Sequence, residues 1–145
     1  MAIFKFIKAI LTGEEIQIYN FGNHSRDFTY IDDVVEGVVR VLDNPAKINC
    51  DWNGKTPDPA SSHAPWRIYN IGNSVPIKLM DCIAALEKAI GRKAKKEYIS
   101  SQLGDVADTW ANMDNTIKEF NFKPNTLFDE GIKKFVEWYR VFYKI

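Results

Sequence analysis

The sequence predicts a small mixed α/β fold, and three observations point to it. Segments whose apolar residues recur at helical spacing alternate along the chain with short runs of β-branched and aromatic residues, which favour strands. At 145 residues the chain has the length of one domain, and a chain of that size buries roughly 68–70% of the surface that its unfolded form exposes. Hydrophobic residues make up 46% and charged residues 26% of the chain, a globular composition that excludes intrinsic disorder.

The first predicted element is a helix over residues 2–12. Its apolar residues lie on one face with lysines opposite, and Gly13 supplies the stop. Such a helix packs on a core; the alternative is a helix on a membrane surface. No apolar run approaches the roughly 18 residues of a membrane span, and Lys5 and Lys8 interrupt any signal-peptide core. We therefore expect a soluble helix and no membrane-spanning segment, and the two cysteines, too few for a disulfide scaffold, favour a reduced, cytoplasmic protein.

Two strands and a second helix are predicted next. Residues 16–19 alternate as a strand does, residues 20–23 have the asparagine and glycine of a turn, and residues 28–31 are β-prone. Asp32 is then expected to cap a helix. The apolar residues of that helix are expected to form a buried stripe: Val34, Val35, Val38, Val39 and Leu42.

The middle of the chain is predicted to begin with a long surface loop. Residues 44–65 are polar and contain four of the six prolines. A buried strand is expected at 66–72, followed by a helix that begins at Pro76 and ends at Gly91. An edge strand is expected at 93–99, because its lysines discourage pairing with other chains.

The last part of the chain is predicted to end in two helices. After an irregular stretch at 100–112, Asp114 is expected to cap a short helix that runs to Phe120. Thr126 and Asp129 form a T-x-x-D capping pattern for the final helix. The apolar face of the final helix is interpreted as core: Leu127, Phe128, Ile132, Phe135, Val136, Tyr139 and Phe142.

Several classes of function are excluded by composition and motifs. The 19 basic and 19 acidic residues cancel, so the basic footprint of a nucleic-acid binder is absent. The eight glycines are at least nine positions apart, which excludes GxGxxG and Walker loops. No tyrosine is followed four residues later by lysine, so the chain has no Tyr-x-x-x-Lys proton-transfer pair. Neither histidine has a second histidine or a cysteine at the spacing of zinc ligands, so we expect no metal site. Two cysteines are too few for a disulfide scaffold, so we expect no disulfides.

Arg26 and Asp105 are candidate binding residues on the basis of residue type. Arg26 follows a glycine-containing turn, where a guanidinium can fork onto a diphosphate; the alternative is a salt bridge to Asp27, Asp32 or Asp33. Asp105 lies in an irregular stretch and can accept hydrogen bonds from a sugar or ribose hydroxyl; the alternative is a turn or cap carboxylate. Asp32 and Asp33 are interpreted as cap and first-turn charges, not as an acid–base pair.

Four segments resemble a known family. They are IYNFGNHSRDFTYIDDVVEGVVRVLD, PWRIYNIGNSVPIKLMDCIAALEKAIG, QLGDVADTWAN and GIKKFVEWYRVFY. Their order and spacing resemble the C-terminal part of nucleotide-sugar epimerases of the extended short-chain dehydrogenase family, also called NAD-dependent epimerase/dehydratases. Within that family the chain is most similar to UDP-glucuronate 4-epimerases. The resemblance runs from about Ala2 to Tyr143.

The resemblance implies an enzyme of which this chain is one part. The complete enzyme has an upstream Rossmann domain, absent from this chain, that binds NAD and carries the Tyr-x-x-x-Lys pair. Hydride passes from C4 of the UDP-sugar to NAD and returns to the other face of the sugar. The chain then corresponds to the UDP-sugar-binding domain over residues 1–145, inactive alone, with no catalytic residue and no bound cofactor. Alternatives are another nucleotide-sugar epimerase or dehydratase, or a non-catalytic binding module.

The resemblance also implies substrate-binding roles for matching positions. Arg26, in the R-D-F motif, matches the arginine that contacts the UDP diphosphate, and Asp105 matches an aspartate near the nucleotide ribose. The residues that match the strand bordering the uracil, largely through backbone groups, are Gln17, Ile18 and Tyr19.

Gln102 stands where many galactose-type epimerases have a second phosphate-binding arginine. A glutamine hydrogen-bonds a phosphate without adding charge, and the glucuronate-type branch tends to have glutamine at this position. Because the face toward the absent Rossmann domain is exposed, we also expect the isolated chain to self-associate in a non-native way, with residues 2–12 as the candidate surface.

Overall fold

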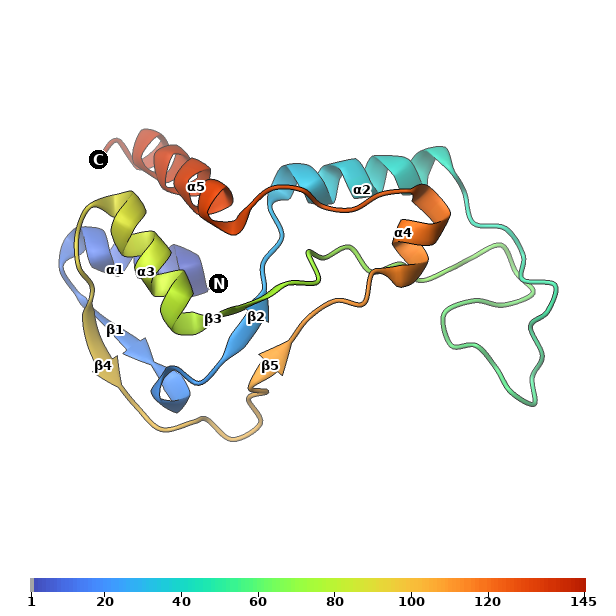
Figure 1. Ribbon diagram of the computed structural model, residues 1–145, viewed down its shortest axis with the longest axis horizontal. Helices are drawn as coiled ribbons and strands as arrows, with labels where there is room; N and C mark the ends of the chain where they lie inside the picture. Colours follow the sequence, from blue (N-terminus) through green and yellow to red (C-terminus); the bar gives the residue numbers. More distant parts are fainter. Residues whose placement is uncertain (1) are drawn as a thin grey trace. The chain divides into compact units, whose positions relative to one another are not determined.

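The computed structural model describes residues 2–145 and confirms the mixed α/β fold (Figure 1). The chain divides into two compact units. Unit 1 contains the described residues up to Phe28 together with Val75–Trp110 and Thr126–Ile145, and unit 2 contains Thr29–Ser74 and Ala111–Asn125. Each unit has an apolar cluster of its own.

Three helices form the core of unit 1. They are α1 (Ala2–Thr12), α3 (Leu79–Ile90) and α5 (Phe128–Tyr143). The predicted first helix is confirmed, and Gly91 ends α3 in a left-handed conformation (φ 79°), as glycine does at helix ends. Eight buried side chains of the three helices form one cluster: Ile7, Ile10, Cys82, Leu86, Ile90, Ile132, Val136 and Tyr139.

Two small sheets complete unit 1. In the first, β1 (Glu15–Ile18) pairs in parallel with β4 (Lys95–Tyr98). In the second, the order is β3-β2-β5. The central β2 (Ser25–Asp27) pairs antiparallel with β3 (Pro76–Lys78) and parallel with β5 (Asp108–Thr109). This register brings the segment before β5 alongside β2.

Glu87 joins the end of α3 to the start of β4. Its side chain is 5% exposed, and it accepts hydrogen bonds from Lys93 (2.7 Å), from the backbone N–H of Ala94 (3.0 Å) and from Lys96. Burial alone raises the pKa of this carboxyl, but the hydrogen bonds from the two lysines and the amide outweigh burial and lower the pKa of Glu87 from its ordinary 4.5 to about 2.

Two predictions for the segment that leads from unit 1 into unit 2 are wrong. The strand expected at 28–31 is β2, three residues earlier, so Arg26 lies inside a strand and not before one. The helix α2 (Ile31–Asp43) begins one residue before Asp32, which therefore lies in the first turn and does not cap the helix. Both differences arise because β2 is positioned by its pairing with β3 and β5, which local propensity does not report.

Three other helix starts also differ from prediction. Pro76 opens β3 because it pairs with β2, so α3 starts later. Asp114 is the first residue of α4 (Asp114–Phe120), and α5 starts after Thr126. The residue at the N-cap position of each of these helices makes no side-chain capping bond, and the N–H of Asp114 donates to Oδ1 of Asn112 (2.9 Å).

Unit 2 contains α2, α4 and a long irregular segment. Residues 44–75, all of which the structure describes, form no helix or strand apart from an isolated bridge between Ser61 and Arg67. The strand predicted at 66–72 is therefore wrong. A β-prone segment forms a strand only where a neighbouring backbone satisfies its N–H and C=O groups, and this segment has only that one bridge.

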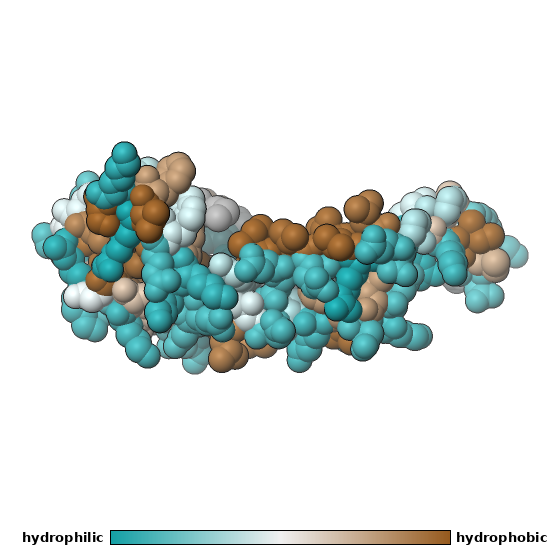
Figure 2. Space-filling view, turned by 90° about the horizontal axis from the view of Figure 1, so that it is seen from above, coloured by the Kyte–Doolittle hydropathy of each residue, from teal (hydrophilic) through white to brown (hydrophobic). Residues whose placement is uncertain are grey.

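The apolar stripe of α2 is exposed, contrary to prediction. In α2 only Asp33 and Gly37 are buried, and Gly37 lies against Ile71 and Phe122. We call the opposite side the α2 apolar face, where Figure 2 shows hydrophobic side chains gathered along the surface. It consists of Ile31, Val35, Val38, Val39 and Leu42, between 44% and 74% exposed.

We expect Glu87→Gln to lower the free energy of unfolding by about 1–3 kcal/mol at neutral pH, because a buried charged hydrogen-bond acceptor is removed. The folded-state pKa lies below the ordinary value, so the stabilisation is present above pH 4.5 and is lost as pH falls toward 2. Urea unfolding of both proteins across this range measures the difference.

The matched control is Glu130→Gln, which removes an exposed pair with Lys134 on α5 and is expected to change the free energy of unfolding by about 0.5 kcal/mol or less. A Glu87→Gln deficit that stays constant down to pH 2 contradicts the assignment.

Candidate functional site

One pocket in unit 1 gathers four of the six predicted site residues. Its volume of about 190 Å³ is below the usual 300–1,000 Å³ of complete ligand pockets. The pocket can therefore hold only part of a nucleotide sugar. Its lining includes four predicted residues, one unpredicted histidine and an apolar wall: Gln17, Tyr19, His24, Arg26, Asp105, Ala2, Phe6, Phe28, Ile77 and Leu79.

The other two predicted residues lie outside the lining of this pocket. Ile18 is fully buried in the core, and its carbonyl accepts a hydrogen bond from the N–H of Ile99 (3.0 Å). Gln102 is exposed, and its carbonyl accepts a hydrogen bond from the N–H of Asp105 (3.2 Å). In this structure the backbone of Gln102 thus closes the turn that carries Asp105.

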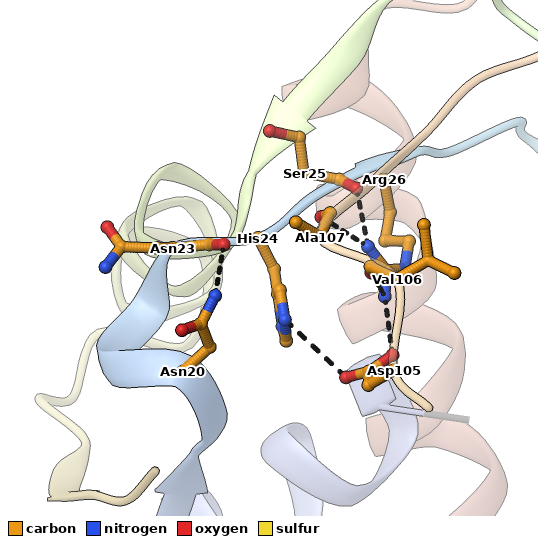
Figure 3. A network of polar contacts seen from close by, with 8 residues as sticks. All are labelled: Asn20, Asn23, His24, Ser25, Arg26, Asp105, Val106 and Ala107. Carbon is orange, nitrogen blue, oxygen red and sulfur yellow. Dashed lines mark hydrogen bonds and ion pairs between the residues drawn. The ribbon is translucent and has the colours of Figure 1, made fainter. Parts of the chain in front are cut away.

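The turn between β1 and β2 positions one side of the pocket. It is a short turn, η1 (Tyr19–Gly22), in which Asn20, Phe21 and Gly22 all have positive φ values (49°, 50° and 86°). The predicted turn is confirmed, and glycine suits it because positive φ values are strained for other residues. The side chain of Asn20 donates to the carbonyl of Asn23 (2.9 Å), which closes the turn (Figure 3).

Arg26 holds the opposite side of the pocket. Its Nη1 donates to the carbonyls of Ser25 (2.8 Å) and Ala107 (2.7 Å). Its Nη2 donates to the carbonyl of Val106 (2.6 Å) and to Oδ1 of Asp105 (3.1 Å) (Figure 3). These four bonds use all four terminal N–H groups of the guanidinium, although the side chain remains 34% exposed.

This geometry changes the interpretation of the two strongest candidates. Arg26 and Asp105 were predicted as separate ligand contacts, yet they bind each other across 79 positions of sequence. The neighbouring aspartates considered as partners of Arg26 are replaced in this role by Asp105. A diphosphate that reaches the guanidinium must therefore share or displace groups that Arg26 already binds.

His24 is a site residue that the sequence analysis missed. Its imidazole is 9% exposed, and Nε2 lies 3.6 Å from Oδ2 of Asp105, the carboxylate oxygen that does not bind Arg26 (Figure 3). A lone histidine beside a turn has no motif. The available signal was its position two residues before Arg26, since residues two apart in extended backbone point to the same side.

Tyr19 and Gln17 form a second polar edge. The hydroxyl of Tyr19 donates to Oε1 of Gln17 (3.3 Å), and Nε2 of Gln17 donates to Glu97 on β4 (3.1 Å). Because the Gln17 amide has partners for both its oxygen and its nitrogen, the strand pair fixes its orientation. The pocket thus combines a cation, a carboxylate and apolar rings, a set that suits a molecule with anionic, hydroxyl and planar parts.

Residues 2–145 contain neither a metal-ligand cluster nor a membrane-spanning helix. No group of three or more His, Cys, Asp or Glu side chains in this range is arranged to hold a metal ion. No helix among these residues has the length and hydropathy needed to span a bilayer. Cys50 is exposed, Cys82 is buried, and both are free thiols.

The chain has relatives among known proteins. Residues 1–72 match the profile of the "NAD dependent epimerase/dehydratase family". The chain is 48% identical over 144 residues to Protein CapI of Staphylococcus aureus, and the aligned region covers 99% of this chain and 43% of that protein. It is 44% identical over 140 residues to a probable UDP-glucuronate 4-epimerase of Rhizobium meliloti (strain 1021), with 96% and 41% covered.

A similar fold occurs in the crystal structure of UDP-glucuronic acid 4-epimerase from Bacillus cereus in complex with UDP-glucuronic acid and NAD. The TM-score is 0.78 at 26% identity, over 99% of this chain and 40% of that one. The chain therefore spans about two fifths of the length of the curated relatives it matches.

Proposed function

The chain belongs to the NAD-dependent epimerase/dehydratase family, and from this premise we propose that it is the UDP-sugar-binding portion of a nucleotide-sugar 4-epimerase with UDP-glucuronate as substrate. Residues 1–145 would serve as one substrate-binding domain of a longer protein. The observation that carries the proposal is the unit 1 pocket, where Arg26 and Asp105 meet beside an apolar wall.

The chemistry of the pocket supports nucleotide-sugar binding. The guanidinium of Arg26 attracts the diphosphate, and a planar fork matches phosphate oxygens better than a lysine ammonium does. Asp105 can accept hydrogen bonds from ribose hydroxyls through its two oxygens. Phe6 and Phe28 contribute apolar rings against which a flat base can pack.

NAD is proposed to bind the remainder of the protein. The glycines of this chain are dispersed, so its residues do not fit the glycine-rich turn that cradles a dinucleotide pyrophosphate. No hydride-transfer step is therefore assigned to this chain, and we expect it to be inactive alone. A cytoplasmic location stays a prediction.

The α2 apolar face supports a partner within the same protein. Its side chains lie within about 100° of arc on the helix, which is the width of a stripe that packs on another element. The relatives are more than twice as long as this chain, so we propose that the Rossmann domain of the full-length protein covers this face. The irregular 66–72 segment has a β-prone sequence and would pair with a strand of that domain.

In the isolated chain, the same face is the proposed surface for self-association. The helix over residues 2–12, which the sequence suggested as the self-association surface, packs Ile7 and Ile10 into the core of unit 1. An alternative function is another nucleotide-sugar epimerase or dehydratase, which substrate profiling of the full-length protein distinguishes. A non-catalytic binding module is excluded if that protein interconverts UDP-sugars.

In the full-length protein, we expect Arg26→Ala to weaken binding of UDP-glucuronate at least tenfold, because a charged hydrogen bond contributes about 1.5–3 kcal/mol. Arg26→Lys keeps the charge but loses the fork, so an intermediate loss is expected. Isothermal titration calorimetry measures both affinities. The matched control is Arg67→Ala, since Arg67 has the same 34% exposure and an ion pair with Glu119 in unit 2. Equal losses in the Arg26 and Arg67 variants, or none, would refute the phosphate role.

We expect Leu42→Glu to reduce self-association of the isolated chain, because it places a charge in the α2 apolar face. Sedimentation velocity at several protein concentrations measures the change. Leu103→Glu is the control, since Leu103 is also exposed but lies outside that face. If both substitutions act equally, or if the unmodified chain is monomeric throughout, the face is not the associating surface.

A further inference from the structure

The unit 1 pocket contains one nearly buried titratable side chain that the proposed substrate contacts do not use. We propose that His24 is a positioning residue that holds one oxygen of Asp105 while Arg26 holds the other, so that the charge of His24 sets how readily Arg26 binds a nucleotide diphosphate. This inference rests on the proposed function and assigns a role to a residue outside the predicted site.

The backbone of His24 is held in place by two hydrogen bonds. The N–H of His24 donates to the carbonyl of Gly22 (2.9 Å), and the carbonyl of His24 accepts from the N–H of Leu79 (2.8 Å). Asp105, in contrast, is 35% exposed and follows Gly104, which has a φ of 86°. The carboxylate is therefore the more movable partner, and His24 is a fixed point toward which it can turn.

Asp105 acts as the resident counter-ion of Arg26. It binds Nη2 at 3.1 Å and so occupies an N–H group that a phosphate oxygen would take. A nucleotide that binds Arg26 must draw this carboxylate away from the guanidinium. His24 lies 3.6 Å from the other carboxylate oxygen, on the side to which Asp105 would be drawn.

The charges around the pocket determine the direction of the effect. Its lining contains one cation, Arg26, one carboxylate, Asp105, and the titratable side chains of His24 and Tyr19; Glu97 lies behind Gln17. With a neutral His24, the charges of Arg26 and Asp105 cancel. A protonated His24 leaves the pocket with a net positive charge and competes with Arg26 for Asp105, so anion binding is favoured. Binding of a diphosphate should therefore tighten as pH falls.

The test uses UDP-glucuronate, whose diphosphate diester and carboxylate keep their charge in the range where imidazole ordinarily titrates, about pH 5 to 8. Calorimetry at about pH 6 and pH 8 is carried out on the chain and on three variants. His24→Phe keeps a ring without a donor, and His24→Gln keeps a neutral donor. His63→Gln is the control, because His63 is the other histidine of the chain and packs on Trp52 in unit 2.

We expect the unmodified chain and His63→Gln to bind about three- to tenfold more tightly at the lower pH. Both His24 variants should lose this pH dependence. At the higher pH, His24→Gln should match the unmodified chain, since its amide can donate to Asp105, whereas His24→Phe should bind more weakly. Wild-type affinity and wild-type pH dependence in both His24 variants would overturn the proposal.

A second readout needs no ligand. The N–H of Ser25 donates to the carbonyl of Ala107 (2.9 Å), so its hydrogen exchange reports how firmly the Asp105 segment is attached to β2. Exchange should be about three- to tenfold faster in His24→Phe and restored in His24→Gln. Unchanged exchange in His24→Phe means that His24 does not hold Asp105. If the unmodified chain binds no UDP-glucuronate at either pH, the proposed function fails, while this exchange result still decides the contact.

Discussion

The pocket of unit 1 depends on the guanidinium of Arg26. Arg26 lies in β2, which pairs with β5 through only two residue pairs, so few backbone hydrogen bonds join the two strands. The side chain adds bonds to the carbonyls of Val106 and Ala107 and to the carboxylate of Asp105. A planar group with donors in fixed directions can make all of these at once, which a lysine cannot. Because these acceptors would otherwise lose partners at a partly buried site, the side chain that we propose as the diphosphate contact also maintains the wall of the pocket.

The two units differ in how completely they bury their apolar residues. In unit 1, side chains from three helices form a buried apolar cluster, and the ion-paired Glu87 lies at its edge. Unit 2 has a smaller cluster of Met113, Phe120 and Phe122, and its longest helix leaves the α2 apolar face exposed. A stripe of that width in a folded protein ordinarily packs on another element. Unit 2 is therefore the part of the chain whose apolar residues are least covered by the described structure.

The sequence predicted the elements whose signals are local and long. The first helix and the glycine end of α3 match the structure because amphipathic periodicity and a left-handed glycine act within one element. The strand at 66–72 and the buried stripe of α2 failed for the opposite reason. A strand needs a neighbouring backbone and a buried stripe needs a covering element; in the described residues the 66–72 segment has only one isolated bridge, and the α2 apolar face is exposed. The position of β2 was misjudged because three residues carry too little pattern to locate a strand.

By itself the sequence determined the helices, the turn at Gly22, the family motifs and two residues of the candidate site, Arg26 and Asp105. Tertiary structure alone decided that Arg26 and Asp105 bind each other and that His24 is the third member of the group. The reason is physical: these residues are far apart along the chain, and only the register of β2 with β5 brings the carboxylate between the guanidinium and the imidazole.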